Sequence, residues 1–231
     1  LDWFFHQTKH STALAKSIGL SNSSTAGDTR FDRVKKLRER DNFVEYIDEF
    51  KQNKKTIVFG SSWESEERLA EIVASKNRDL KMIIAPHDLK RVANLKEIFP
   101  SAMLYSQLTN SQVFNSSNSQ VLIIDCIGLL SKLYSYGDLA VVGGGFHSKG
   151  LHNILEAATF GIPVLFGDHY QKNPEADELI AQHGGKSFED EFFAAPYILN
   201  LLNDDESMKK MSENARNFIN SQPNASDIIL K

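Results

Sequence analysis

The stretch from Gly143 to Glu156 holds the residues best suited to bind a nucleotide. It joins an apolar strand pattern to a helix pattern and opens with three consecutive glycines. Glycines let a backbone approach a ligand closely, and the next helix offers free N–H groups and a positive dipole end to a phosphate. Lys149 could add charge, and Glu156 could accept hydrogen bonds from ribose hydroxyls. The pattern leaves one alternative open, an ordinary glycine-rich turn whose Glu156 caps its helix.

Two well-known phosphate-binding motifs do not fit this stretch. A P-loop needs Lys-Ser/Thr after its last glycine, but Gly150 is followed by Leu151-His152. The dinucleotide fingerprint needs a third glycine where this chain has Ser148. These departures disfavour a P-loop NTPase and an NAD enzyme.

Metal and nucleophile chemistry find little support in the sequence. Four histidines, His147, His152, His169 and His183, lack the spacing of metal ligands, and no nucleophile elbow is present. The single cysteine, Cys126, excludes an internal disulfide, and we expect it to be a small core residue. We expect Trp63 to serve in packing.

Composition restricts the class of protein further. The 231 residues are 41% hydrophobic and 24% charged, which is typical of a globular chain. The net charge of -4 argues against a general nucleic-acid binder. No apolar run approaches the ~18 residues that span a bilayer. The chain starts at Leu1 without a signal-peptide pattern, so we expect it to be a piece of a longer protein.

Apolar runs alternate with helical patterns, which predicts a doubly wound α/β fold: a parallel sheet with helices on both faces. The expected strands are 3–6, 56–59, 80–85, 102–105, 121–125, 139–142 and 163–166. We expect one long amphipathic helix over about 33–50, a capping box of Ser61 and Glu64, an exposed loop over 106–120, and a mostly helical chain after 174. In such sheets, ligands bind at the carboxyl ends of the strands.

Four motifs then occur in one order: 26–32 (AGDTRFD), 60–67 (GSSWESEE), the glycine-rich stretch ending in 152–156 (HNILE), and 161–167 (GIPVLFG). Together they resemble the 3-deoxy-D-manno-octulosonic acid (Kdo) transferases over roughly residues 24–185. The resemblance implies a GT-B fold of two Rossmann-like domains. Residues 1–31 would be the end of the preceding N-terminal domain and a crossover linker, and residues 32–231 the C-terminal domain that binds the donor, CMP-Kdo.

The resemblance also implies an activity. The family transfers Kdo from CMP-Kdo to a lipid A precursor in lipopolysaccharide biosynthesis, without a metal or other cofactor. Its general base is a glutamate of the N-terminal domain, so we expect this chain to be soluble and inactive alone. The full-length protein would lie at the cytoplasmic face of the bacterial inner membrane, attached through its N-terminal part. No nucleic-acid partner is implied.

Carried over by position, the family's CMP contacts fall at three strand ends: Pro86-His87, Ile127-Gly128-Leu129 and Asn153-Ile154-Leu155-Glu156. Further candidates are Arg30, Ser61, Lys149 and Gly150. Two positions depart from the family pattern, because His87 replaces an arginine and Leu129 a glutamate. A bidentate phosphate contact is then lost unless a protonated histidine or another basic group compensates.

Two other functions remain open. Another GT-B enzyme, such as a UDP-sugar transferase or a UDP-N-acetylglucosamine 2-epimerase, shares the glycine-rich turn and the helical glutamate. A sugar-nucleotide binding module without turnover is the second, supported only by the changes at His87 and Leu129.

Overall fold

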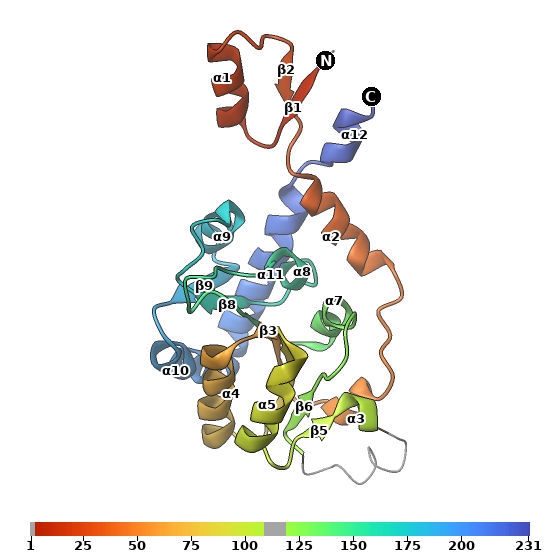
Figure 1. Cartoon of the computed structure of the whole chain (residues 1–231), viewed down its shortest axis with the longest axis vertical. Helices are drawn as coiled ribbons and strands as arrows, with labels where there is room; N and C mark the ends of the chain where they lie inside the picture. Colours follow the sequence, from red (N-terminus) through yellow and green to blue (C-terminus); the bar gives the residue numbers. More distant parts are fainter. Residues whose placement is uncertain (1–2, 109–118) are drawn as a thin grey trace.

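A computed structural model describes residues 3–108 and 119–231, and its centre is a seven-stranded sheet (Figure 1). The strand order is β5-β6-β4-β3-β7-β8-β9, and every neighbouring pair is parallel. The strands are β3 (Thr56–Ser62), β4 (Lys81–Pro86), β5 (Met103–Leu104), β6 (Val121–Ile123), β7 (Leu139–Val142), β8 (Val164–Gly167) and β9 (Gly185–Phe188). The predicted α/β class is confirmed.

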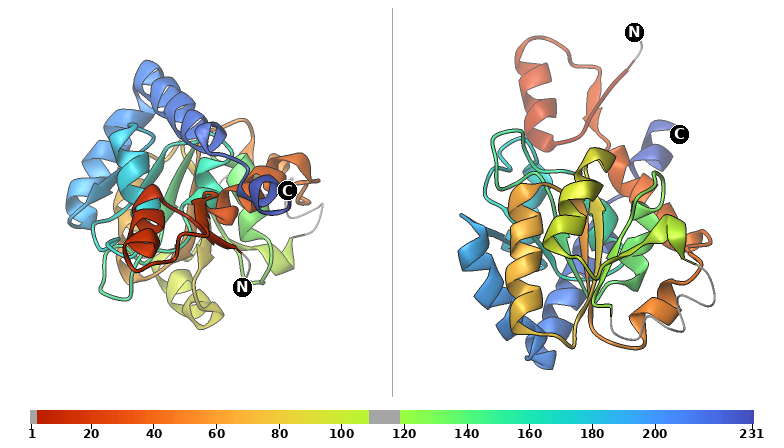
Figure 2. Two further views of the ribbon diagram at one scale, coloured as in Figure 1. Left: turned by 90° about the horizontal axis from the view of Figure 1, so that it is seen from above. Right: turned by 60° about the horizontal axis from the view of Figure 1, so that its bottom comes forward.

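Helices cover both faces of this sheet (Figures 1 and 2). One face packs on α4 (Glu64–Lys76), α5 (Val92–Ile98) and α10 (Glu191–Leu202). The other packs on α2 (Thr29–Glu39), α3 (Ile47–Lys51), α7 (Leu130–Leu133), α8 (Leu155–Ala158), α9 (Pro174–Ala181) and the end of α11 (Asp205–Ser221). Alternation along β3 explains the two cores, since Ile57 and Phe59 face one layer and Val58 the other.

A small unit precedes the large sheet. Its strands β1 (Phe4–His6) and β2 (Ser23–Thr25) pair in parallel around α1 (Lys9–Ser17). They form a separate two-stranded sheet, which lies at the end of the molecule beside the last helix, α12 (Ala225–Ile229) (Figure 1). The division into residues 1–31 and 32–231 stays a prediction.

The expected long helix over 33–50 is wrong, because the chain breaks between α2 and α3. The Asn42 side chain donates a hydrogen bond to the Leu37 carbonyl at 2.7 Å, which takes up an acceptor at the end of α2. Tyr46 then adopts a positive φ of 68°, which no helix accommodates. Both helices still bury their apolar residues against the sheet. The apolar spacing therefore predicted correctly which residues are buried, but not that the helix is interrupted.

Other expectations also need correction. The helix after β3 begins at Glu64, so the predicted Ser61–Glu64 capping box is wrong. Instead, Glu66 accepts a hydrogen bond from the Trp63 N–H at 2.9 Å. Strand β9 and helix α12 were not expected. Most of the predicted loop over 106–120 lies outside the described residues. None of the described helices is both long and apolar enough to cross a bilayer.

Two adjacent buried glutamates at the start of α4 tie neighbouring loops together. Glu66 also accepts a hydrogen bond from the Gly144 N–H at 3.0 Å, which holds the glycine-rich turn after β7. Glu67 forms a bidentate ion pair with Arg91, both distances 2.7 Å, which holds the segment after β4. Both carboxylates are fully buried, so α4 fixes the loops that follow β3, β4 and β7 relative to one another.

Burial sets the protonation of Glu66. Removal from water raises the pKa of its carboxyl to about 7, although the N–H groups of Trp63 and Gly144 favour the charged form. The folded protein therefore binds this proton more tightly than the unfolded chain does. The corresponding stability is fully present below the ordinary pKa of 4.5 and is lost as the pH rises to about 7.

We therefore expect the Glu66→Gln variant to have a flatter dependence of stability on pH. Between pH 4.5 and 7 the parent should lose up to about 3 kcal/mol of unfolding free energy that the variant does not lose, since one pKa unit is worth about 1.4 kcal/mol. Urea denaturation of both proteins across this range measures the difference. Parallel pH profiles would contradict the assignment.

Candidate nucleotide site

The carboxyl ends of the central strands meet in a tightly packed crossing of backbones. The Gly143 N–H donates a hydrogen bond to the Gly60 carbonyl at 2.8 Å, and a Cβ at residue 143 would collide with the Ser61 carbonyl oxygen. Gly145 and Gly167 pass each other so closely that a Cβ on either would strike the other's backbone. Only glycine fits at these positions, and the turn after β7 therefore lies directly against the ends of β3 and β8.

Side chains from three of these loops gather on one indole. The His87 ring stacks on Trp63 at 4.4 Å between centroids, and the His147 ring meets its edge at 5.0 Å. The Trp63 Nε1–H donates a 3.4 Å hydrogen bond to His152 Nε2, and the Lys149 ammonium lies 4.1 Å from the indole centroid. The ring centroids of His87 and His152 are 4.6 Å apart. We call these five residues the Trp63 cluster.

The electrostatics of the Trp63 cluster are those of crowded bases. Burial lowers the pKa of His152, and the neighbouring His87 and His147 lower it further. Burial also lowers the pKa of His147, with contributions from Lys149, His169 and His87. The Nε2 atom of His147 is buried without a hydrogen-bond partner among the described residues. His147 and His152 are therefore disposed to be neutral until an anion arrives.

A cavity of about 540 Å³ lies beside the cluster, between the ends of β4 and β6. His87 belongs to the Trp63 cluster and also lines this cavity. The cavity brings together two of the predicted segments, Pro86-His87 and Ile127-Gly128, and the half-buried Cys126 also lines it. Cys126 thus packs at the edge of the core that we expected it to occupy, and one side of it faces the cavity. The Ile127 side chain is 88% exposed and Gly128 has a φ of 97°, which leaves the backbone of this turn open to a ligand.

Asn153 and Glu156 form the third predicted segment. The Asn153 Oδ1 accepts a hydrogen bond from the Leu155 N–H at 3.0 Å, and its Nδ2 donates one to Glu156 Oε1 at 3.2 Å. Glu156 is half-buried and close enough to Tyr134 to help raise the pKa of that buried phenol, which burial raises most. The amide thus orients the carboxylate at the start of α8, and within the described part of the chain its second oxygen is left available to a ligand hydroxyl.

Several predicted site residues have structural roles instead. Arg30 forms a bidentate ion pair with Glu175, at 2.9 and 3.0 Å, and a further hydrogen bond with Asp28, so its guanidinium is already occupied. The side chains of Ile154 and Leu155 are fully buried, so only their backbone could contact a ligand. Leu129 packs against the core.

The remaining two candidates belong to the backbone of the site. Ser61 holds a φ of 53° at the end of β3, where the glycine-rich turn crosses it. Gly150 has a φ of 98° and donates a hydrogen bond to the His147 carbonyl at 3.2 Å, which closes the loop that carries Lys149. Across residues 3–108 and 119–231, no three His, Cys, Asp or Glu side chains are grouped as metal ligands.

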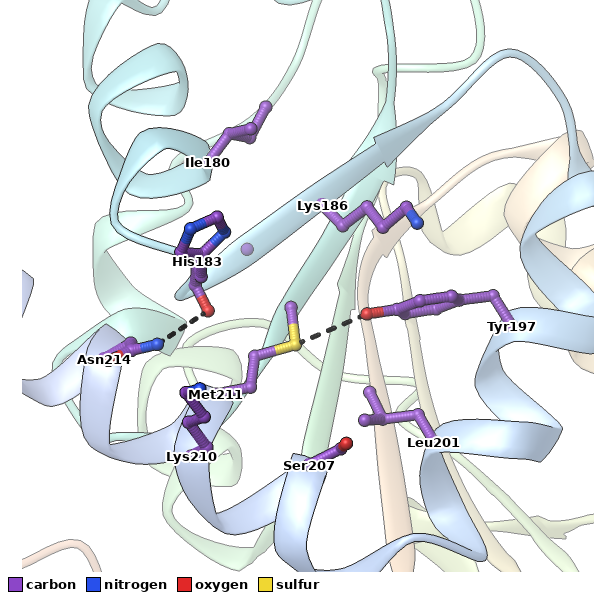
Figure 3. Close-up of a pocket in the computed structure, with 10 residues that line it drawn as sticks. Ile180, His183, Lys186, Tyr197, Leu201, Ser207, Lys210, Met211 and Asn214 are labelled. Atoms are coloured by element: carbon purple, nitrogen blue, oxygen red, sulfur yellow. Dashed lines mark hydrogen bonds between the residues drawn. The ribbon is translucent and has the colours of Figure 1, made fainter.

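A second cavity, of about 520 Å³, lies away from these loops, where β9 begins between α9, α10 and α11 (Figure 3). Its polar groups are largely paired with one another: the Tyr197 hydroxyl contacts Met211 Sδ, Asn214 donates to the His183 carbonyl, and Lys186 lies over the Tyr197 ring at 4.2 Å. It contains none of the predicted site residues, and its Lys210 offers a control position.

Sequence reasoning missed the principal members of the Trp63 cluster. It assigned Trp63 to packing and considered His147 and His152 only as metal ligands. One signal was available, because Glu66 shares the helical spacing of the buried Ala70 and Val73 and therefore had to lie on the covered face. A buried carboxylate needs polar partners, and the loops at the strand ends lie nearest to the start of this helix. Glu66 could therefore have been expected to contact them.

Comparisons with known proteins give the relatives of this chain. No protein-family model matches the sequence. A 3-deoxy-D-manno-octulosonic acid transferase of Chlamydophila psittaci is 26% identical over 201 residues, which are 86% of this chain and 46% of that protein. The chain thus spans about half the length of the curated relatives it matches.

Solved structures share the fold. The C-terminal CMP-Kdo binding domain of WaaA from Acinetobacter baumannii has a TM-score of 0.66 at 20% identity, covering 82% of this chain and 97% of that domain. The UDP-GlcNAc 2-epimerase of Neisseria meningitidis, bound to UDP-GlcNAc, has a TM-score of 0.63 at 19% identity and covers 99% of this chain and 60% of that one. The predicted GT-B type, Rossmann-like domain is confirmed, and the chain is a relative of the Kdo transferases with the fold of their C-terminal domain.

Proposed function

We propose that this chain is the donor-binding half of a glycosyltransferase that moves Kdo from CMP-Kdo to a lipid A precursor in lipopolysaccharide biosynthesis. One observation carries the proposal. Two of the three segments that the resemblance pairs with CMP line a single cavity. The third, Asn153 to Glu156, directly follows His152, whose ring contacts the ring of His87 at the edge of that cavity. Its relatives named as Kdo transferases support the same donor.

The chemistry divides between two halves of the protein. An acceptor hydroxyl attacks the anomeric carbon of Kdo, the bond from that carbon to the phosphate oxygen breaks, and CMP leaves. A base outside this chain takes the hydroxyl proton. The part that falls to this chain is to hold the nucleotide and to stabilise the phosphate with basic side chains and backbone N–H groups.

We propose that this step needs no metal or other cofactor, because the basic Trp63 cluster itself supplies positive charge at the phosphate. The lipid A precursor and the membrane would be contacted through the other half of the protein. We expect this chain alone to bind the donor but to show no transfer, since the acceptor site and the base lie outside it.

A UDP-sugar enzyme is the second candidate, because the UDP-GlcNAc 2-epimerases share the fold over 99% of this chain. Titration separates the two. We expect CMP to bind in the presence of EDTA and to bind at least about tenfold more tightly than UMP, a difference of about 1.4 kcal/mol. Calorimetry measures both constants. Preference for UMP, or binding that appears only with Mg²⁺ or Mn²⁺, would contradict the proposal.

Glu156 gives the sharpest test of the ribose contact. If its free oxygen accepts hydrogen bonds from the ribose hydroxyls, Glu156→Ala removes charge-assisted bonds worth about 1.5–3 kcal/mol. Affinity for CMP should then fall by roughly ten- to a hundredfold. The melting temperature should hardly move, because Asn153 still caps the Leu155 N–H.

Two controls accompany this variant. Glu213→Ala removes an exposed carboxylate from α11, far along the chain from the site, and should leave CMP affinity unchanged. Replacing CMP by 2′-deoxy-CMP should weaken binding to the parent more than to Glu156→Ala. Equal CMP affinity in parent and Glu156→Ala would show that the carboxylate does not contact the nucleotide.

A further inference from the structure

The basic side chains at the strand ends are arranged unusually for a phosphate site. The family pattern implies an arginine at position 87, a cation at every physiological pH. Here that position is His87, and its ring contacts Trp63 and His152 at centroid distances of 4.4 and 4.6 Å. His147 and Lys149 approach the same indole from the glycine-rich turn. Four groups that can carry positive charge thus surround one aromatic ring.

The carboxylates near these groups contact residues outside the Trp63 cluster. On α4, Glu66 accepts from two backbone N–H groups, Glu67 pairs with Arg91, and the exposed Glu64 lies 3.5 Å from Arg68. After β4, Asp88 accepts from the Lys90 N–H, and after β8, Asp168 lies 3.1 Å from His169. Glu156 on α8 accepts from Asn153. Among the ion pairs of the described residues, none joins a carboxylate to the Trp63 cluster.

A cluster of bases without a counter-ion has a defined response to an anion. While the site is empty, burial and mutual repulsion lower the pKa values of His147 and His152, and the 3.4 Å bond from Trp63 occupies the Nε2 lone pair of neutral His152. A phosphate within a few ångströms reverses this preference, because an opposite charge favours the protonated imidazole. Binding of the anion and binding of a proton are then linked.

We propose that the phosphate of the nucleotide binds against the Trp63 cluster and that the two histidines of the glycine-rich turn, His147 and His152, take up about one proton as it binds. The inference rests on the proposed function in taking the anion to be a nucleotide phosphate. Its consequence is that affinity for the donor falls as the pH rises, whereas an arginine site would bind equally well across the same range.

The test needs a nucleotide whose own charge does not change with pH. The phosphate monoester of CMP titrates near pH 6, so the probe is the 5′-methyl ester of CMP, a phosphodiester that keeps one negative charge throughout. Calorimetry at pH 7.5 in buffers of different ionisation enthalpy counts the protons taken up. We expect close to one proton per nucleotide bound, and an affinity that falls by up to about tenfold per pH unit above neutrality.

Two variants assign the proton. The double variant His147→Gln/His152→Gln should bind the ester with no proton uptake and with an affinity that is flat from pH 6.5 to 8.5. Lys210→Ala, a change at the second cavity, should behave like the parent. Proton uptake near zero in the parent, or a parent affinity independent of pH, would overturn the proposal, and neither result depends on a variant that folds. Uptake that persists in the double variant would overturn the assignment to His147 and His152.

The same experiment separates this inference from the proposed function. If the methyl ester of UMP binds with proton uptake and that of CMP does not bind, the Trp63 cluster is a proton-linked phosphate site but the donor is not CMP-Kdo. If the CMP ester binds without proton uptake, the donor proposal stands and the proton-linked site is wrong. If neither ester binds, both are wrong.

Discussion

The buried carboxylate of Glu66 is the contact on which the candidate site depends. It accepts the N–H of Trp63 at the start of α4 and the N–H of Gly144 in the glycine-rich turn, at 2.9 and 3.0 Å. Next to it, Glu67 anchors the segment after β4 through Arg91. A buried charge is costly unless such partners satisfy it, so the loops cannot move apart without exposing an unpaired carboxylate. Ligand-binding loops are thereby held at fixed positions on a rigid sheet.

This anchoring explains why bases from separate loops can meet on one indole. Trp63 precedes α4, His87 follows β4, and His147 and His152 belong to the turn after β7. The ties to α4, together with the backbone hydrogen bonds from His87 to Ser62 and from Gly143 to Gly60, bring their rings within about 4–5 Å. An arginine at position 87 would bind phosphate through a fixed charge. The proposed proton uptake by His147 and His152 instead makes binding depend on pH, a difference in chemistry on an unchanged fold.

Much of the fold was predictable, because the central strands are apolar on both faces and each is followed by a helical period. The edges were not. β9 reads Gly185-Lys186-Ser187-Phe188, which has too few apolar residues to signal a strand and forms by pairing with β8. The break after Glu39 comes from a local side-chain bond of Asn42. The Trp63 cluster depends on contacts between distant segments, which periodicity does not describe, so the sequence indicated the right loops but not which of their side chains meet.

Hydrogen–deuterium exchange of this chain, with and without the methyl ester of CMP, tests most directly whether the strand-end loops form one nucleotide site. The account predicts slower exchange in three segments at once: 86–88, 126–129 and 143–156, with no change around the second cavity at Lys186 and Lys210. Protection confined to that second cavity, or to only one of the three segments, would contradict it.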